Sequence, residues 1–451
     1  MVRADLVADA ARLLDPGWLT EQRWYGANDR QLRALALADA APLPTAGAPG
    51  WLLIVEATFE KGAPNRYLVP AVADAAGGRL HEPRDGDGTW RALAAALIEH
   101  AVLDGEAGSF RGETSPTAPA LLPGGVEELA ALAERRLGVQ QTNTSVAIGD
   151  RLILKLYRRL QAGENPELEV GTFLESVGSR VVPRMAGSMR YIATESAAAA
   201  LLQERLETMG DAWAQVVAML SGADGGPDAG LKAASRIGSV TARLHGDLAA
   251  RPHDLLFPVR MADPAERREW LANAKRQADR AEQAVTGSDA TRLAELMPGI
   301  RARMERSLAA AVEARVTRIH GDYHLGQLLC IADGYAVIDF EGEPARPLAE
   351  RRAPAPPERD VAGMLRSLDY AARTVERERG DGNGNGFDAD GWLALAREAL
   401  LRAYAADAPA PPDDDLLEAF ELEKACYEVS YEAANRPDWT WLPLEALARL
   451  L

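Results

Sequence analysis

The stretch RIHGDYHLGQLLCIADGYAVIDFEGEP, residues 318–344, holds the most informative group of polar residues in the chain. It contains the carboxylate of Asp322, an amide five residues later at Gln327, and a second carboxylate at Asp339. Two apolar runs flank the turn Asp333-Gly334, which predicts a β-hairpin between the amide and the second carboxylate. The expected order is therefore loop, strand, turn and strand, with polar groups at both ends.

This order of polar groups meets the needs of phosphoryl transfer. Transfer from ATP requires a carboxylate that orients and deprotonates the acceptor hydroxyl, and oxygen ligands for the Mg²⁺ that bridges the phosphates. An aspartate, an amide at plus five and a second aspartate after a hairpin reproduce the spacing of a kinase catalytic loop and its metal-binding aspartate. The segment thus predicts an ATP- and Mg²⁺-dependent small-molecule kinase.

The tripeptide His320-Gly321-Asp322 would predict little by itself. A second copy, His245-Gly246-Asp247, lies in SVTARLHGDLAA, where neither a hairpin nor a second aspartate follows, so we interpret it as the end of a helix. The alternative for the first copy is a surface hairpin with turn-forming aspartates and a packed histidine. The three elements in the correct order favour the functional interpretation.

The motifs HLGQ (324–327) and DFEGEP (339–344) resemble the aminoglycoside-phosphotransferase branch of the kinase-like fold. Within that branch they are most similar to actinobacterial maltokinases and glucosamine kinases. The resemblance covers nearly the whole chain, including the RWY cluster at 23–25 and NRP at 435–437. It implies an α+β, bilobal protein-kinase-like (aminoglycoside phosphotransferase) fold with an extra N-terminal cap subdomain.

The same resemblance assigns roles to the polar residues. It implies that Asp322 is the catalytic base, that Gln327 and Asp339 bind Mg²⁺, and that Glu341 lies in the outer sphere of the metal. A glutamine replaces the usual asparagine here, but it presents the same type of ligand atom.

Bulk composition excludes several other classes of protein. The net charge of −17 and pI near 5.0 disfavour nucleic-acid and membrane-surface binding, which need cationic patches. The N-terminus shows no signal peptide, and no apolar run is long enough for a membrane span. Cys330 and Cys426 are too few for a disulfide framework, which favours the cytoplasm. We assume a monomer.

The pattern of apolar and polar residues along the chain predicts three segments. Residues 1–85 form the cap subdomain, 86–202 form an intermediate segment and N-lobe with the ATP-binding sheet, and 203–451 form a mainly helical C-lobe. Strands are expected at 51–60, 66–72, 181–183 and 190–194; helices at 2–14, 89–103 and 166–177; and longer helices at 231–248, 265–285, 289–314, 360–379, 390–405 and 414–434. The Gly/Ser/Thr/Pro-rich stretch 108–119 reads as an exposed loop or linker.

A kinase needs a cation for the phosphates, and Lys155 is the one lysine between Lys61 and Lys232. It lies on a predicted strand that is followed by a helix with Glu167 and Glu169, either of which would pair with it. We favour Glu169.

No Walker or GxGxxG loop is present. The polar turn 139–145, with Thr144 and Ser145, is the candidate for phosphate contacts. The segment Gln203-Glu204-Arg205-Leu206 resembles a lobe connector, in which the backbone of Glu204 and Leu206 would meet the adenine.

The C-terminal tail concentrates residue types that bind sugars, although they would equally suit a packed core with a solvated face. The candidate substrate residues, beside Asp322, are Glu428, Tyr431, Glu432, Asn435, Asp438 and Trp439. From the resemblance of EAANRPDWTW to the glucosamine kinases, we expect glucosamine to be phosphorylated at its 6-hydroxyl. Maltose phosphorylated at the anomeric hydroxyl is the alternative.

Two other interpretations of the sequence are less consistent with its residues. A catalytically silent kinase-like binding module is disfavoured because Lys155, Asp322, Gln327 and Asp339 are all present. The stretch 381–392 begins like an EF-hand loop but carries Trp392 where a bidentate glutamate is required, so it predicts an inter-helix loop. The proline-rich segment 347–358 is expected to be a loop near the metal site.

Overall fold

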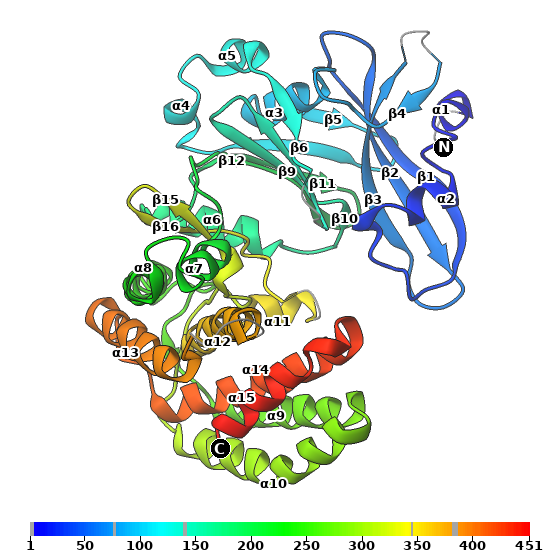
Figure 1. Cartoon of the computed structure of the whole chain (residues 1–451). Helices are drawn as coiled ribbons and strands as arrows, with labels where there is room; N and C mark the ends of the chain where they lie inside the picture. Colours follow the sequence, from blue (N-terminus) through cyan, green and yellow to red (C-terminus); the bar gives the residue numbers. More distant parts are fainter. Residues whose placement is uncertain (1–3, 75–77, 139–141, 344–345, 381–386) are drawn as a thin grey trace. The chain divides into compact units, whose positions relative to one another are not determined.

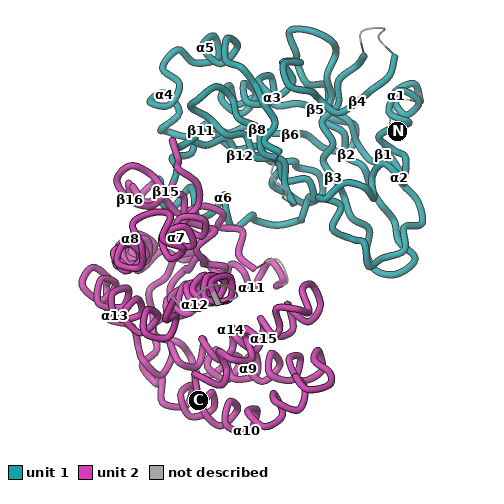
Figure 2. The backbone as a smooth tube through the Cα atoms, viewed as in Figure 1, with its two compact units in different colours: residues 1–175, 183–206 teal, residues 176–182, 207–451 magenta. Residues whose placement is uncertain are grey.

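The computed structural model describes residues 4–74, 78–138, 142–343, 346–380 and 387–451 (Figure 1). The chain forms two compact units (Figure 2). Unit 1 comprises residues 1–175 and 183–206, and unit 2 comprises residues 176–182 and 207–451. The chain passes from unit 1 to unit 2 directly after Leu206, at the end of the predicted connector. The further division of unit 1 at residue 85 stays a prediction.

Unit 1 is built on two antiparallel sheets. The five-stranded sheet has the order β1-β2-β3-β10, with β4 also paired to β3, and the seven-stranded sheet has the order β5-β6-β11-β12-β9-β8-β7. The strands are β1 Leu32–Leu43, β2 Gly50–Phe59, β3 Asn65–Ala73, β4 Leu80–His81, β5 Val102–Asp104, β6 Ser109–Thr114, β7 Glu134–Arg136, β8 Thr144–Ile148, β9 Leu152–Leu156, β10 Arg159–Leu160, β11 Met185–Ile192 and β12 Ser196–Glu204. The helices are α1 Ala4–Asp9, α2 Pro16–Thr20, η1 Arg23–Tyr25, α3 Thr89–Ile98, α4 Ala118–Leu121, α5 Gly125–Ala131 and α6 Pro166–Ser176.

Strand β2 shows why the five-stranded sheet is covered on both faces. Successive side chains of a strand point to opposite faces, and β2 is apolar on both. Leu52 and Ile54 pack into a core with Trp90 of α3, whereas Leu53 packs into a second core with Trp24. Trp24 and Tyr25 of the predicted RWY cluster therefore belong to the N-terminal core, whereas Arg23 is exposed.

Unit 2 is mainly helical, as the 3.6-residue periodicity predicted. Its helices are α7 Ala212–Leu220, α8 Gly226–Leu248, α9 Pro264–Ala284, α10 Gly287–Ala310, η2 Leu325–Gln327, α11 Leu348–Arg352, α12 Glu358–Gly380, α13 Ala389–Asp407, α14 Asp414–Asn435, η3 Pro437–Trp439 and α15 Trp441–Arg449. The strands are β13 Arg260–Met261, β14 Arg315–Val316, β15 Leu328–Ile331 and β16 Gly334–Val337. In the described parts of the chain, every helix is too short or too polar to traverse a bilayer. The stretch 381–386 of the EF-hand-like interpretation lies outside the described residues.

The structure corrects the predicted linker at 108–119. Ser109–Thr114 is strand β6, which pairs with both β5 and β11 inside the seven-stranded sheet. Phe110 is fully buried against Tyr191, with ring centroids 4.9 Å apart. A Cβ added at Gly112 would lie 2.1 Å from the carbonyl oxygen of Ala96. The small residues that resembled a linker therefore allow helix α3 to approach the sheet closely.

Two more predicted elements differ from the structure. The expected helix 89–103 ends at Ile98, because His100 adopts a positive φ of 54°, and β5 follows. The expected strand 181–183 is not formed. Instead, the carbonyl of Val181 accepts a hydrogen bond from Val337 N in the hairpin of unit 2, at 2.7 Å.

Candidate active site

The predicted hairpin is present and brings the two candidate metal ligands together. Strands β15 and β16 pair in an antiparallel register, and Gln327 precedes the hairpin while Asp339 follows it. The Nε2 of Gln327 lies 3.4 Å from Oδ2 of Asp339. Asp339 adopts a positive φ of 68°, a conformation that is uncommon for a residue with a side chain and that often marks a functional site.

His320 fastens the loop that carries Asp322 to the same hairpin. Its Nε2 donates to the carbonyl of Ile338 at 2.9 Å, and its Nδ1 accepts from the backbone N–H of Asp322 at 3.3 Å. Because the carbonyl only accepts and the N–H only donates, the imidazole is the neutral tautomer with its proton on Nε2. The ring also packs on Phe340, with centroids 4.8 Å apart. The histidine is thus a buried support for the loop.

Asp360 on helix α12 anchors the loop from the other side. Its carboxylate accepts hydrogen bonds from the backbone N–H of His320 at 2.7 Å and of Gly321 at 2.9 Å. It also lies 3.2 Å from Nε2 of His245. Burial by itself would raise the pKa of Asp360, but the hydrogen bond and charge of His245, with the other donors, leave it below the usual value of 3.8. Asp360 therefore stays ionised as a buried anchor.

Close packing of α12 on the catalytic loop depends on a small residue. A Cβ added at Gly363 would lie 2.6 Å from the carbonyl oxygen of Tyr323, one residue after Asp322. Any larger side chain would push the helix and the loop apart. Gly363 therefore brings Asp360 within reach of the loop backbone.

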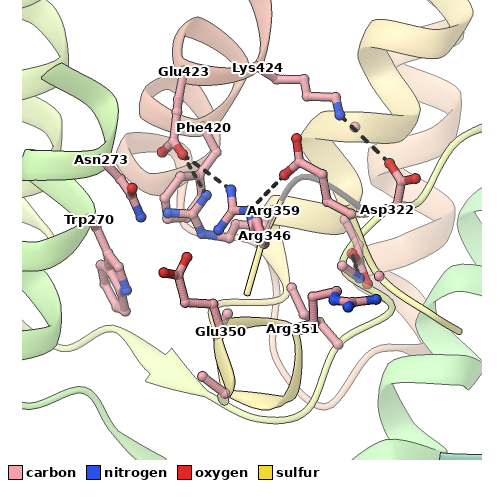
Figure 3. Close-up of a pocket in the computed structure, with 18 of the residues that line it drawn as sticks. Trp270, Asn273, Asp322, Arg346, Glu350, Arg351, Arg359, Phe420, Glu423 and Lys424 are labelled. Carbon is pink, nitrogen blue, oxygen red and sulfur yellow. Dashed lines mark hydrogen bonds and ion pairs between the residues drawn. The ribbon is translucent and has the colours of Figure 1, made fainter. Parts of the chain in front are cut away.

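A pocket of about 400 Å³ opens beside Asp322 within unit 2 (Figure 3). Its walls are the catalytic loop, the segment that follows Asp339, and one face each of α9, α12 and α14. The lining carries more acidic than basic side chains. The acidic ones are Glu266, Glu269, Asp322, Glu343, Glu350, Asp360 and Glu423, and the basic ones are Arg346, Arg351, Arg359 and Lys424.

Several of these charges are paired. Lys424 lies 3.8 Å from Oδ1 of Asp322, as the dashed line in Figure 3 marks. Glu343 pairs with Arg346 at 2.6 Å. Burial would raise the pKa of Glu343, but the charges of Lys424 and Arg346 bring it below its ordinary value. Glu343 is therefore ionised at neutral pH.

The carboxylates of the C-terminal tail are engaged in ion pairs. Glu428 receives two hydrogen bonds from Arg366, at 2.9 and 2.7 Å, and Glu432 receives two from Arg436, at 2.9 and 2.6 Å. The Oη of Tyr370 also donates to Glu432 at 3.2 Å. A sugar would have to compete with these partners.

The other tail candidates form a ring-and-guanidinium cluster. Tyr431 stacks on Tyr427 with centroids 6.2 Å apart, and Trp439 lies beneath the guanidinium of Arg436 at 5.5 Å. Asn435 donates to the carbonyl of Tyr431, and Asp438 is exposed. Among the described residues that line the pocket, α14 contributes Phe420, Glu423, Lys424 and Tyr427, whereas the six predicted tail residues are not in the lining. Their sugar contacts stay a prediction.

On the nucleotide side, in unit 1, Lys155 forms a buried ion pair. Its Nζ lies 2.7 Å from Oε2 of Glu167, which also accepts from the hydroxyl of Tyr157 at 2.7 Å. The structure thus corrects our preference for Glu169. Residues two apart on a helix point in different directions, and Glu167 is the one directed at Nζ.

The other nucleotide candidates lie near Lys155 or at the end of unit 1. Ser145 is directly opposite Lys155 in the β8–β9 pair. The hydroxyl of Thr144 accepts from Nε of Arg158 at 2.7 Å. Residues 139–141 of the predicted phosphate turn lie outside the described residues.

The predicted lobe connector, residues 203–206, makes hydrogen bonds within unit 1. The backbone N–H of Glu204 donates to the carbonyl of Arg184 at 2.8 Å, so this N–H is already engaged. Gln203 lies in strand β12, and Leu206 ends unit 1. Roles for these residues in nucleotide binding stay predictions.

The sequence pattern did not predict a role in the site for some of these residues. Asp360 was predicted only as the first residue of a helix and His245 as part of a helix end, yet both support the catalytic loop. Lys424 and the α9 wall of the pocket were not singled out. The one available signal was the second His-Gly-Asp, since a histidine on an otherwise apolar helix face needs a partner.

Comparisons with known proteins identify the family of the chain. Residues 134–413 match the model of the phosphotransferase enzyme family, and residues 18–105 match the maltokinase N-terminal cap domain. A glucosamine kinase from Streptacidiphilus jiangxiensis is 32% identical over 400 residues, 86% of each chain. One from Mycolicibacterium smegmatis is 29% identical over 416 residues, 87% of this chain and 97% of that one.

A solved structure of a glucosamine kinase in complex with glucosamine, ADP and inorganic phosphate has a similar fold. It is 27% identical, with a TM-score of 0.72, and covers 100% of this chain and 99% of its own. The predicted fold class and the predicted resemblance are thereby confirmed. With the family match spanning more than half of its length, this chain belongs to the phosphotransferase enzyme family.

Proposed function

We propose that the protein transfers the γ-phosphate of ATP to the 6-hydroxyl of glucosamine. The observation that carries this proposal is the pocket beside Asp322, whose lining has seven carboxylates against four cationic side chains. An excess of negative charge attracts an ammonium group and gives no advantage to a neutral sugar. The relatives named as glucosamine kinases support the same substrate.

In the proposed reaction Asp322 accepts the proton of the sugar hydroxyl. The hydroxyl oxygen forms a bond to the γ-phosphorus while the bond to the bridging oxygen breaks, and ADP leaves. His320 and Asp360 hold the loop so that Asp322 keeps its position, and Lys424 lies beside the carboxylate. Positioning of this kind lowers the barrier because the reacting groups need no further ordering.

Gln327 and Asp339 would hold the Mg²⁺ that accompanies ATP. Both side chains carry the hard oxygen atoms that Mg²⁺ prefers, and the 3.4 Å contact from Nε2 of Gln327 to Oδ2 of Asp339 shows that the two side chains lie together. The ion would neutralise charge on the phosphate oxygens. Glu341 remains a candidate for the outer sphere.

Lys155 and Glu167 are the proposed phosphate-binding pair, and the backbones of Glu204 and Leu206 the proposed adenine contacts. Support for the first comes from burial: an ion pair this enclosed keeps Nζ in one place. We place the reaction in the cytoplasm, as the free, buried thiols of Cys330 and Cys426 favour, and keep the monomer as the working state.

Maltose is the second candidate acceptor, because residues 18–105 match a maltokinase cap domain. Initial rates with ATP, Mg²⁺ and a panel of glucosamine, glucose, maltose and an aminoglycoside separate the possibilities. We expect the highest kcat/KM for glucosamine. Turnover of maltose but not of glucosamine would refute the proposed acceptor and leave the kinase intact.

A further inference from the structure

Helices α9 and α14 meet at the pocket through one aromatic contact. The rings of Trp270 and Phe420 lie edge to face, with centroids 6.1 Å apart. Residues three, four and seven apart share a helix face, so Gln277 follows Trp270 on the α9 face and Glu423 follows Phe420 on the α14 face. Both are in the pocket lining.

These two residues carry buried acceptor atoms without a hydrogen-bond partner. Across the described residues, Oε2 of Glu423 and Oε1 of Gln277 are among sixteen buried side-chain atoms in this condition, and both belong to residues of the pocket lining. Glu423 is only 3% exposed, and its second oxygen is drawn on the Asn273 side of the pocket (Figure 3). Buried polar atoms in native proteins are nearly always bonded, and an exception calls for a missing donor.

The surrounding charges indicate which donor fits. Oε1 of Glu423 lies 3.0 Å from Arg359 and 3.7 Å from Arg346, so the negative charge of this carboxylate is already balanced. Gln277 is neutral. An ammonium group at this place would be repelled by the two guanidinium groups, whereas a hydroxyl gains a hydrogen bond at no electrostatic cost.

We propose that Gln277 and Glu423 accept hydrogen bonds from the non-reacting hydroxyls of the sugar and so determine acceptor specificity. This inference rests on the proposed function, since it places a sugar in the pocket of Asp322. It also separates two recognition tasks: the excess of acidic over basic side chains in the pocket lining attracts the amine, and the α9–α14 wall selects the hydroxyl pattern.

A substrate–variant cycle tests the proposal. The kcat/KM of the wild type and of Gln277→Met is measured with glucosamine and with its 3-deoxy and 4-deoxy analogues. For the wild type, loss of the hydroxyl that contacts Gln277 should lower kcat/KM by about tenfold, as one neutral hydrogen bond allows. In Gln277→Met the same analogue should show almost no further loss, so the two changes are not additive.

Gln283→Met is the matched control, since Gln283 lies on the exposed side of the same helix. It should keep the wild-type discrimination between glucosamine and both analogues. Gln277→Met should also retain the wild-type melting temperature, because Oε1 has no partner to lose.

Two outcomes would overturn the inference. Additive effects for every deoxy analogue would mean that these atoms bind only internal water, and a large fall in the melting temperature of Gln277→Met would mean a structural role. Failure of the wild type to phosphorylate glucosamine at all would instead refute the proposed function, so the two failures are distinguishable.

Discussion

The two His-Gly-Asp tripeptides of this chain have the same side chains and different roles. At 245–247 the tripeptide lies within helix α8, where helical bonding uses the backbone groups. At 320–322 it lies in a loop in which Gly321 adopts a φ of 84° and the N–H groups are free to bind Asp360. Backbone conformation, and not side-chain identity, decides which aspartate meets the pocket.

The two copies nevertheless meet at one carboxylate. Asp360 binds the backbone of the loop copy and the imidazole of His245, whose Nδ1 lies 2.8 Å from the hydroxyl of Tyr404. The helix copy therefore supports the position of the loop copy. Substitutions matched between the two copies test this division.

The largest expected difference separates the two aspartates. Asp322→Asn should lower kcat by about 10³-fold, because the amide cannot accept the hydroxyl proton. Asp247→Asn should stay within about twofold of the wild type, since its side chain is outside the pocket lining. Steady-state rates at saturating glucosamine, ATP and Mg²⁺ measure both. Equal losses in the two variants would contradict the assignment of the base.

Removal of the shared anchor should destabilise the whole site. Asp360→Ala leaves two backbone donors and His245 without an acceptor in a buried place, which should cost about 3–5 kcal/mol in the free energy of unfolding. Urea unfolding followed by circular dichroism measures this. A loss below about 1 kcal/mol would show that the two copies are not coupled through Asp360.

The glycines of the two copies should respond with opposite signs. Gly321→Ala places a Cβ at a φ of 84° and should cost about 1–2 kcal/mol in stability. Gly246→Ala, in the helix with no atom within 4 Å of the added Cβ, should gain about 0.5–1 kcal/mol. Melting temperatures of the two variants give the comparison, and shifts of the same sign would be inconsistent with it.

The smallest expected effect is the pH dependence of the anchor. The folded pKa of Asp360 is lowered from 3.8, so its stabilising contribution is complete above pH 3.8 and is lost as the pH falls through the folded value. Below pH 3.8 the free energy of unfolding of Asp360→Asn should therefore fall less steeply than that of the wild type. Parallel slopes would mean that this carboxylate is not stabilised on folding.

Much of the site could be predicted because it lies within one short segment. Asp322, Gln327 and Asp339 are joined by a hairpin whose apolar runs and Asp-Gly turn define its register, so their proximity follows from local chain geometry. The long helices of unit 2 could be predicted equally well, because the apolar face of each helix is encoded in the periodicity of its own sequence. The short strand β6 could not be predicted, since its pairing partner β11 lies far along the chain.

The sequence by itself determined the catalytic segment and the kind of reaction, since the spacing of the polar residues encodes them, and its resemblance to a known family implied the fold class. Only the tertiary structure decided that Lys155 pairs with Glu167, that Asp360 joins both His-Gly-Asp copies, and that α9 provides a wall of the pocket. These contacts join residues distant in the sequence. Helix packing sets them, and no local pattern encodes how two helices will meet.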